Sequence, residues 1–285
     1  MSGEKVSIKT LQEKKRKNEK ITMLTAYDYP TAKLVDKSGI DSILVGDSVS
    51  NNILGMENTL TVSMDEMVHH TKAVKRGVEN ALLIADMPFL SYQASEEEAV
   101  KNAGRFLQEA GAESVKIEGG EKSLSQIKKI IDAGIPVMGH LGLTPQRIHQ
   151  FGGYGLRGKS RKEAMKIYED AMKLEEAGVF SLVLESVPSQ VSKTITDELE
   201  IPTIGIGAGP HCDGQVLVIN DILGMSEISP KFAKEYVDLE SKIKDAIVNF
   251  RKEVESGEFP AKSHSYEMKK EEKKQLEELK RNRSN

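Results

Sequence analysis

Short, continuously apolar segments alternate with longer amphipathic stretches from about residue 20 to about residue 250. Parallel strands that are buried on both faces have this continuous hydrophobicity, whereas half-exposed strands alternate. Eight segments are predicted as strands: ITMLTAY, SILVGD, ALLIADMP, SVKIEG, PVMGH, SLVLES, PTIGIG and VLVIND. Eight strands followed mostly by helices, within about 230 residues, match the size of a (β/α)8 (TIM) barrel. A doubly wound open sheet is the alternative fold.

Helix start and stop signals fall between these segments, where a barrel needs its helices. Serine followed three residues later by glutamate is the spacing of a capping box, and glycine before the next strand is typical of the residue that closes a helix. The serine–glutamate pairs are Ser63 and Glu66, Ser95 and Glu98, and Ser160 and Glu163; the glycines are Gly39, Gly111, Gly134 and Gly178.

The ends of the chain lie outside this rhythm. We predict an N-terminal arm or capping helix over residues 1–20, one barrel domain over 21–262 and a charged extension over 263–285. The extension is rich in helix formers but lacks a continuous apolar stripe, which favours a solvated helix. A contact between copies through Met268, Leu276 and Leu279 is the alternative.

Composition excludes several classes of protein. A formal net charge of -4 over 285 residues gives no basic surface for nucleic acid. The single cysteine, Cys212, excludes an internal disulfide framework and suits a reducing compartment. No apolar run approaches the roughly 20 residues that cross a bilayer, and no secretory signal is visible. We therefore expect a cytoplasmic protein that has no membrane or nucleic-acid partner.

Charged residues stand at the predicted strand ends, where barrel enzymes build their active sites. Lys116 and Glu118 are two apart on one strand, so their side chains point to the same side. Any one of these residues alone is consistent with a solvated or helix-capping group. The full set is Asp47, Asp86, Lys116, Glu118 and Glu185.

Several carboxylates at one barrel mouth repel each other unless a cation lies between them. Magnesium takes oxygen ligands and uses one or two carboxylates beside water and substrate. We therefore predict a Mg²⁺ site formed by Asp47, Asp86 and Glu118. No cysteine cluster or His-x-x-x-His helix supports zinc.

The remaining candidates are histidines and a glycine-rich loop. His140 follows the fifth predicted strand and so faces the same mouth, where it is a candidate ligand contact. His69 and His70 lie in mid-helix and are expected to be surface or packing residues. The GIGAG segment, residues 205–209, is consistent with a phosphate loop after the seventh strand, although a plain tight loop is the commoner role of such glycines.

The chain resembles the ketopantoate hydroxymethyltransferase family in a series of blocks that follow one another in order. They run from about residue 5 to about residue 265 and comprise TAYDYPTAKL, SILVGDS, DEMVHHTKAV, ADMPFLSYQ, VKIEGG, GHLGLTPQ, LVLESVP, IPTIGIGAG and DGQVLV. The sequence departs from the family at Val49-Ser50-Asn51 and in the loop GYGLRGKS. Neither departure removes a proposed site residue.

The resemblance implies the first committed step of pantothenate biosynthesis. A hydroxymethyl group passes from 5,10-methylenetetrahydrofolate to 3-methyl-2-oxobutanoate and yields 2-dehydropantoate, through an enolate stabilised by Mg²⁺. The family's metal ligands correspond to Asp47, Asp86 and Glu118, and its proton acceptor corresponds to Glu185. Its oxo-acid contacts correspond to Asp47, Ser48, Asp86 and Lys116, with His140 nearby. The family also implies a homo-oligomer, commonly a decamer.

Two other functions fit parts of the pattern. A Mg²⁺-dependent enolate lyase of the phosphoenolpyruvate mutase and isocitrate lyase type shares the barrel and the use of Mg²⁺ to stabilise an enolate. Its cysteine-bearing K-[KR]-C-G-H loop, however, is missing here. A non-catalytic binding barrel has no reason to keep the five charged residues together. Lys116 could form a Schiff base, but the adjacent metal cluster already supplies the electron sink.

Overall fold

The computed structural model describes residues 4–226 and 230–282. Internal contacts divide the chain into two units, residues 1–236 and residues 237–285, which are described separately below.

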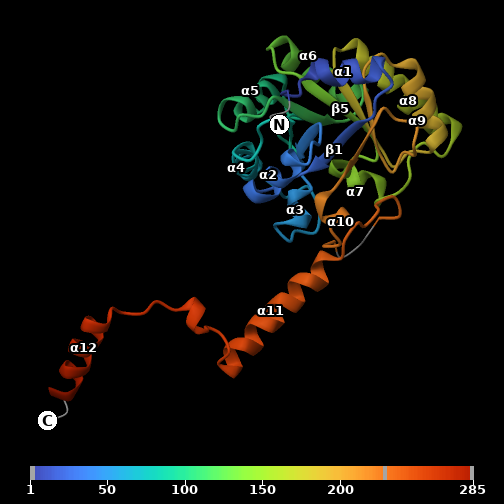
Figure 1. Ribbon diagram of the computed structural model, residues 1–285. Helices are drawn as coiled ribbons and strands as arrows, with labels where there is room; N and C mark the ends of the chain where they lie inside the picture. Colours follow the sequence, from blue (N-terminus) through green and yellow to red (C-terminus); the bar gives the residue numbers. More distant parts are fainter. Residues whose placement is uncertain (1–3, 227–229, 283–285) are drawn as a thin grey trace. The chain divides into compact units, whose positions relative to one another are not determined.

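The first unit is a closed barrel of eight parallel strands (Figure 1). Each strand pairs with the next along the chain, and the last pairs with the first. The predicted (β/α)8 barrel is therefore confirmed, and the open sheet is excluded. The strands are β1 Ile21–Thr25, β2 Ser42–Val45, β3 Leu82–Asp86, β4 Ser114–Glu118, β5 Val137–Gly142, β6 Ser181–Glu185, β7 Thr203–Ile206 and β8 Gly214–Leu217.

Helices follow most strands and begin where the serine caps predict. Ser63 and Glu66 form the full reciprocal box, while Ser95 and Ser160 each accept the backbone N–H three residues on. All four helix-closing glycines have positive φ. The helices of this unit are α1 Ile8–Arg16, α2 Tyr29–Lys37, α3 Val49–Asn52, α4 Met64–Lys75, α5 Glu96–Gln108, α6 Leu124–Asp132, α7 Ile148–Phe151, α8 Arg161–Glu176, α9 Ser189–Glu198 and α10 Ile219–Ile222, with the 3₁₀ turns η1 Glu121–Ser123 and η2 Pro145–Arg147.

Alternation along each strand divides the buried side chains into two cores. In β3, Leu83 and Ala85 pack outward against the helix layer, whereas Leu82 and Ile84 fill the barrel interior. Asp86 continues the inward series, one step nearer the carboxyl end of the strand. The same alternation points charged groups of β4, β5 and β6 into the barrel mouth.

Helix α1 closes the opposite end of the barrel (Figure 1). Its buried Leu11 belongs to the interior core, so the side chain fills the amino-terminal end of the barrel interior. The N-terminal segment was expected to be a charged arm or a capping helix, and residues 8–16 form the helix; residues 1–3 of that segment lie outside the described part.

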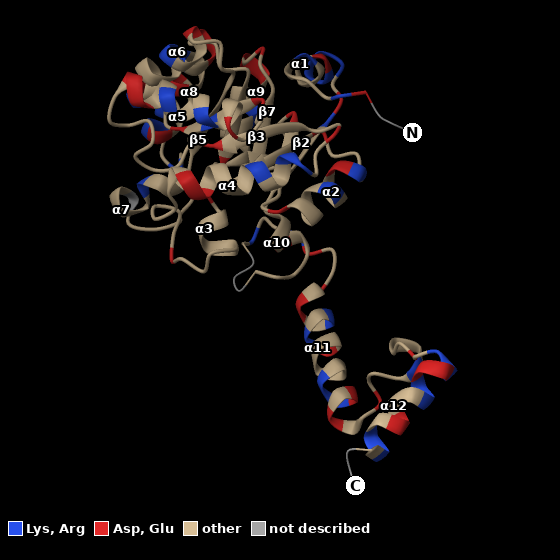
Figure 2. Cartoon of the chain, turned by 90° about the vertical axis from the view of Figure 1, so that its left-hand side faces the viewer, with Lys and Arg blue, Asp and Glu red and all other residues tan. Residues whose placement is uncertain are grey.

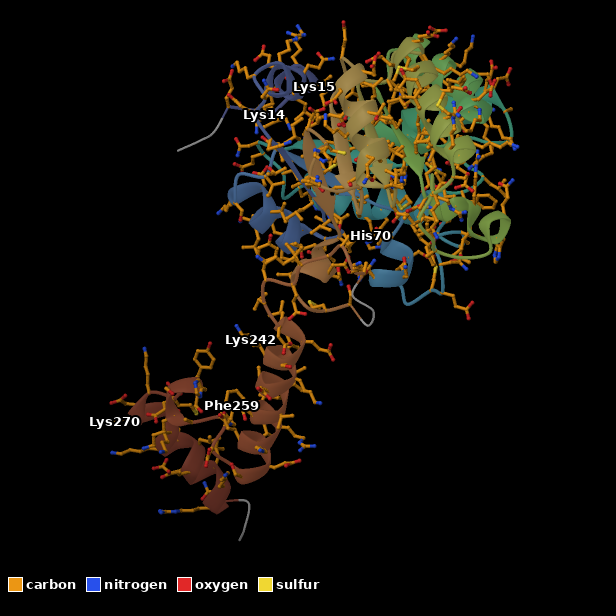
Figure 3. All side chains as sticks on the ribbon, turned by 90° about the vertical axis from the view of Figure 1, so that its right-hand side faces the viewer. Lys14, Lys15, His70, Lys242, Phe259 and Lys270 are labelled. Carbon is orange, nitrogen blue, oxygen red and sulfur yellow. The ribbon has the colours of Figure 1, made fainter. Side chains whose placement is uncertain are left out.

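Three lysines attach this N-terminal segment to acids that precede strands, and two of them, Lys14 and Lys15, are labelled in Figure 3. Lys14 pairs with Asp41 before β2, and Lys15 Nζ lies 2.8 Å from Asp213 Oδ2 before β8. Lys5 Nζ lies 2.8 Å from Glu113 Oε2 before β4. Asp41 and Asp213 each also accept a hydrogen bond from a threonine N–H of a neighbouring strand. Each acid therefore connects the beginning of its own strand to α1 and to the neighbouring strand.

A second buried acid, Asp36, holds α2 to the start of β3, and its removal is expected to destabilise the barrel. Its Oδ1 accepts the N–H groups of Ala81 at 2.7 Å and Asn80 at 2.9 Å. We expect Asp36→Ala to lower the free energy of unfolding at pH 7 by about 3 kcal/mol, because hydrogen bonds to a charged group contribute about 1.5–3 kcal/mol each. Urea denaturation followed by circular dichroism measures this, with the exposed Asp132→Ala as the matched control.

The effect of Asp36 is expected to depend on pH. Burial raises the pKa of Asp36, but the backbone N–H groups of Ala81 and Asn80 outweigh it, and the pKa is lowered. A carboxyl group with a depressed pKa stabilises the fold above its unfolded pKa of about 3.9, and the contribution is lost as pH falls through the folded value. The difference between wild type and Asp36→Ala should therefore shrink below about pH 4; a constant difference would contradict the role of the charge.

The eighth strand differs from its prediction. VLVIND, residues 216–221, was predicted as a strand, but β8 occupies Gly214–Leu217 and α10 begins at Ile219. Gly214 pairs with Ile204 and Ile21 of the two neighbouring strands, and an added Cβ there would lie 2.5 Å from the Ile21 carbonyl oxygen. The close approach requires glycine, so the strand begins at a residue that hydrophobicity does not mark.

The second unit consists of α11 Leu239–Ser256, the 3₁₀ turn η3 Lys262–His264 and α12 Lys270–Asn282. We predicted that the barrel domain extends to residue 262, whereas contacts separate the units after Tyr236. The amphipathic pattern of α11 suits a barrel helix, but a pattern does not specify the unit against which a helix packs. None of its side chains is fully buried, and Phe259 contacts the rings of Phe250 and His264.

The extension predicted over 263–285 contains α12, whose side chains are also exposed, in agreement with the expected solvated helix; residues 283–285 are not described. Figure 2 shows charges of both signs along α11 and α12. Met268, Leu276 and Leu279 are exposed, and their contact with a second copy stays an untested alternative. Across the described part of the chain, each helix is too short or too polar to span a bilayer.

Candidate active site

The carboxyl ends of β2 to β6 bring the predicted charged residues to one mouth of the barrel. Asp86 and Glu185 end β3 and β6, Lys116 and Glu118 lie in β4, and Asp47 follows β2. A cavity of about 1380 Å³ opens there. Every residue predicted for the site lines it: Asp47, Ser48, Asp86, Lys116, Glu118, His140 and Glu185.

Lys116 lies at the centre of this group and is buried. Its Nζ is 3.0 Å from Asp86 Oδ1 and 3.2 Å from His140 Nδ1. Burial lowers the pKa of Lys116, but the carboxylates of Asp86, Glu118 and Asp47 outweigh it and raise the pKa. The lysine is therefore a permanent positive charge, which is unsuited to the free-amine chemistry of a Schiff base.

Asp47 lies beside Asp86 at the end of the second strand. The backbone N–H of Asp47 donates to Asp86 Oδ2 at 3.0 Å. Burial raises the pKa of the Asp47 carboxyl well above its ordinary value, and the charges of Asp86 and Glu118 raise it further. One lysine therefore does not offset the negative charge of the three acids.

Ser48 enters the cavity next to Asp47 and is oriented by a buried tyrosine. The hydroxyl groups of Tyr27 and Ser48 lie 2.8 Å apart. His70 Nδ1 lies 2.7 Å from the carbonyl oxygen of Tyr27. His70 was expected to be a surface or packing residue; it is half-buried and anchors the backbone at Tyr27 (Figure 3). Tyr27 lies in a predicted strand but carries no charge that would have marked it.

His140 connects the acids of β4 and β6. Its Nε2 lies 3.1 Å from Glu185 Oε2, and its Nδ1 lies 3.6 Å from Glu118 Oε1. Burial and the nearby Lys116 lower the pKa of His140, but hydrogen bonding to Glu118 and Glu185 outweighs both and raises the pKa to about 9. The imidazole therefore bridges the acids of β4 and β6 beside the ammonium of Lys116.

Two uncharged side chains that we had not predicted belong to the same site. Gln146, in η2 after β5, is buried and donates from Nε2 to Asp47 Oδ2 at 2.9 Å. Tyr92 lies 2.9 Å from Gln146 Oε1 through its hydroxyl group. Gln146 ends the block GHLGLTPQ, and Tyr92 lies within ADMPFLSYQ, so the family blocks were the available signal.

The GIGAG segment forms a tight loop at the cavity. Gly207 and Gly209 both have positive φ and line the cavity. A Cβ on Gly207 would lie 2.6 Å from the ring of Phe232, so this glycine allows a close approach of the following segment. The tight loop was the favoured expectation, and phosphate binding by this loop stays an untested alternative.

Solved structures with the same fold come from another group of barrels. Phosphonopyruvate hydrolase, solved as a complex with oxalate and Mg²⁺, gives a TM-score of 0.59 at 13% identity, with 97% of each chain covered. 2,3-Dimethylmalate lyase, a member of the PEP mutase/isocitrate lyase superfamily, gives 0.55 at 12% identity over 97% of this chain and 96% of its own. At this identity the likeness establishes the fold alone.

Sequence relatives are much closer. The 3-methyl-2-oxobutanoate hydroxymethyltransferase of Syntrophomonas wolfei is 55% identical over 268 residues, which cover 94% of this chain and 97% of that protein. The protein of the same name from Caldicellulosiruptor saccharolyticus is 57% identical over 263 residues, covering 92% and 99%. The family model described as ketopantoate hydroxymethyltransferase matches residues 5–262. The chain therefore belongs to the ketopantoate hydroxymethyltransferase family.

Proposed function

We propose that this chain transfers a hydroxymethyl group from 5,10-methylenetetrahydrofolate to 3-methyl-2-oxobutanoate and forms 2-dehydropantoate. Relatives at 55–57% identity carry the name of this transferase over nearly their full length. The observation that carries the proposal is the single cavity in which Lys116, three acids and Glu185 meet. Binding of a 2-oxo acid needs positive charge at its oxygens, and removal of its C3 proton needs a base within reach.

The acids of this cavity suit a divalent cation. Three carboxylates converge beside one lysine, and hard oxygen donors are what Mg²⁺ prefers. Within residues 4–226 and 230–282, no three His, Cys, Asp or Glu side chains lie close enough to hold one ion jointly. We therefore assign Asp47 and Asp86 as the direct carboxylate ligands. Glu118 adds negative charge next to them without binding the ion directly. When bound, the cation supplies positive charge to the oxygens of the oxo acid as negative charge develops.

Side chains of the protein supply further positive charge to the oxo acid and orient it in the site. The buried ammonium of Lys116 lies 3.0 Å from Asp86, and we assign to it the stabilisation of the oxo-acid oxygens. Ser48, held by the hydroxyl of Tyr27, offers a hydrogen bond to the substrate carboxylate. These groups are fixed before substrate arrives, and preorganised charge lowers the barrier most effectively.

Glu185 is the proposed proton acceptor. It ends β6, lines the cavity and retains 17% exposure of its side chain, so substrate can reach it. The neighbouring His140 Nε2 lies 3.1 Å from Glu185 Oε2 and thereby fixes the orientation of the carboxylate. After proton removal, C3 of the oxo acid carries the electron pair that forms the new carbon–carbon bond to the one-carbon unit.

The test of function is product formation from purified protein with Mg²⁺. 3-Methyl-2-oxobutanoate, methylenetetrahydrofolate and water should give equal amounts of 2-dehydropantoate and tetrahydrofolate, measured by mass spectrometry and absorbance. Product should not form when the folate is omitted. Cleavage of a hydroxy acid without folate would instead support the lyase alternative, which the fold likeness at 12–13% identity does not favour.

The proposed enzyme is cytoplasmic and assembles as a homo-oligomer. A cytoplasmic location is supported by the single cysteine, Cys212. The proposed partners are the two small-molecule substrates and further copies of this chain in a homo-oligomer. Sedimentation of the purified protein measures the number of copies.

A further inference from the structure

Gln146 joins the two acidic strands of the site through its own hydrogen bonds. Its carboxamide Nε2 donates to Asp47 Oδ2 at 2.9 Å and to the carbonyl oxygen of Met87 at 2.9 Å. Its backbone N–H donates to Glu118 Oε2 at 3.1 Å. One buried residue after β5 therefore contacts Asp47, which follows β2, and Glu118, which ends β4.

The orientation of the carboxamide follows from these partners. The carboxylate of Asp47 and the carbonyl of Met87 both accept hydrogen bonds, and only the NH₂ group can donate to both. On the other side, Gln146 Oε1 lies 2.9 Å from the Tyr92 hydroxyl and accepts from Gln93 Nε2 at 3.1 Å. The Tyr92 hydroxyl is also 3.0 Å from the carbonyl of Glu118, so its single proton is shared between two acceptors.

Charge explains why a neutral clamp is needed here. Asp47 and Glu118 repel each other, and both are attracted to the ammonium of Lys116. A further lysine or arginine would hold the acids but would cancel the negative charge that attracts a cation. The amide donors of Gln146 hold both carboxylates and add no net charge.

We propose that Gln146, oriented by Tyr92, is a positioning residue that holds the metal ligand Asp47, and the adjacent Glu118, in the arrangement that binds the divalent cation. The inference rests on the metal-binding part of the proposed function. Groups that orient metal ligands typically contribute 10- to 100-fold in metal affinity.

The test compares Mn²⁺ binding by wild type, Gln146→Met and the exposed control Gln108→Met, measured by electron paramagnetic resonance without substrates. Methionine keeps the length of the side chain and removes both amide donors. We expect a dissociation constant about 10- to 100-fold higher for Gln146→Met and an unchanged one for Gln108→Met. At saturating Mn²⁺, the kcat of Gln146→Met should recover towards that of wild type, which a damaged fold would not allow.

A milder variant keeps the test decisive if Gln146→Met does not fold. Tyr92→Phe keeps the ring and removes the hydroxyl that orients the carboxamide, and we expect about fivefold weaker Mn²⁺ binding from one lost hydrogen bond. Wild-type affinity in every folded variant would overturn the positioning role, and so would a wild type that binds no Mn²⁺. Because the titration uses neither substrate, a failure to form 2-dehydropantoate would count against the proposed function alone.

Discussion

Glu185→Gln is expected to slow exchange of the C3 proton of 3-methyl-2-oxobutanoate with solvent by a factor of about 100 to 10,000, the range that a positioned general base contributes. Glutamine keeps the shape of the side chain but does not accept a proton at neutral pH. Proton NMR in D₂O, with Mg²⁺ and without folate, follows the loss of the C3 signal directly. This reaction isolates proton removal from the later carbon–carbon bond formation.

Two comparisons make the Glu185 result specific. Mn²⁺ affinity should stay at the wild-type value, because Glu185 lies beside His140 and is not one of the assigned metal ligands. Glu176→Gln, an exposed change at the end of α8, should leave the exchange rate unchanged. Exchange by Glu185→Gln at the wild-type rate would show that another group is the base.

Lys116→Met is expected to destabilise the metal-free protein by about 3–5 kcal/mol, the usual effect of removing one partner from a buried ion pair. Without the ammonium, the buried carboxylates of Asp86, Glu118 and Asp47 face one another with no central cation. Because the pKa of Lys116 is raised, its stabilising charge is fully present at pH 7 and is lost only as pH rises through the folded pKa. Urea denaturation at pH 7 without divalent ions measures the loss.

Added Mg²⁺ should restore part of the stability of Lys116→Met, because an ion that binds only the folded state stabilises it by mass action. The increase in the free energy of unfolding that Mg²⁺ gives to Lys116→Met should exceed the increase it gives to wild type, because the variant has more uncompensated negative charge. Lys128→Met, an exposed change on α6, serves as the control. Wild-type stability of Lys116→Met without metal would show that the acids do not depend on this lysine.

The charged part of the site could be predicted because the spacing of residues along a strand determines which side of the sheet their side chains face. Lys116 and Glu118 are two residues apart in a strand, so alternation placed both in the barrel, and Asp86 ends an inward series in the same way. The parallel arrangement then brought the strand ends to one mouth. Charge at the end of an apolar run is a signal that one sequence can carry.

Gln146 and Tyr92 could not be predicted from the same reasoning. Both are uncharged, both lie after a strand rather than in it, and their roles depend on loop paths that no periodicity encodes. The division of contacts after Tyr236 has no signal in the sequence pattern for a related reason. The stripe of α11 specifies an apolar face, and the surface that it covers is a property of the folded chain.

The lysines of the N-terminal segment set an order in which the barrel can be completed during synthesis. Lys14 can meet Asp41 once the second strand has left the ribosome, and Lys5 can meet Glu113 before the fifth strand exists. Lys15 has no such early partner, because Asp213 is 198 residues later in the chain. We therefore expect α1 to be joined to the growing sheet by Lys14 and Lys5 first, and its ion pair with Asp213 to form when β8 pairs with β1. Ribosome stalling before residue 213 should leave that corner open to proteases and chaperones.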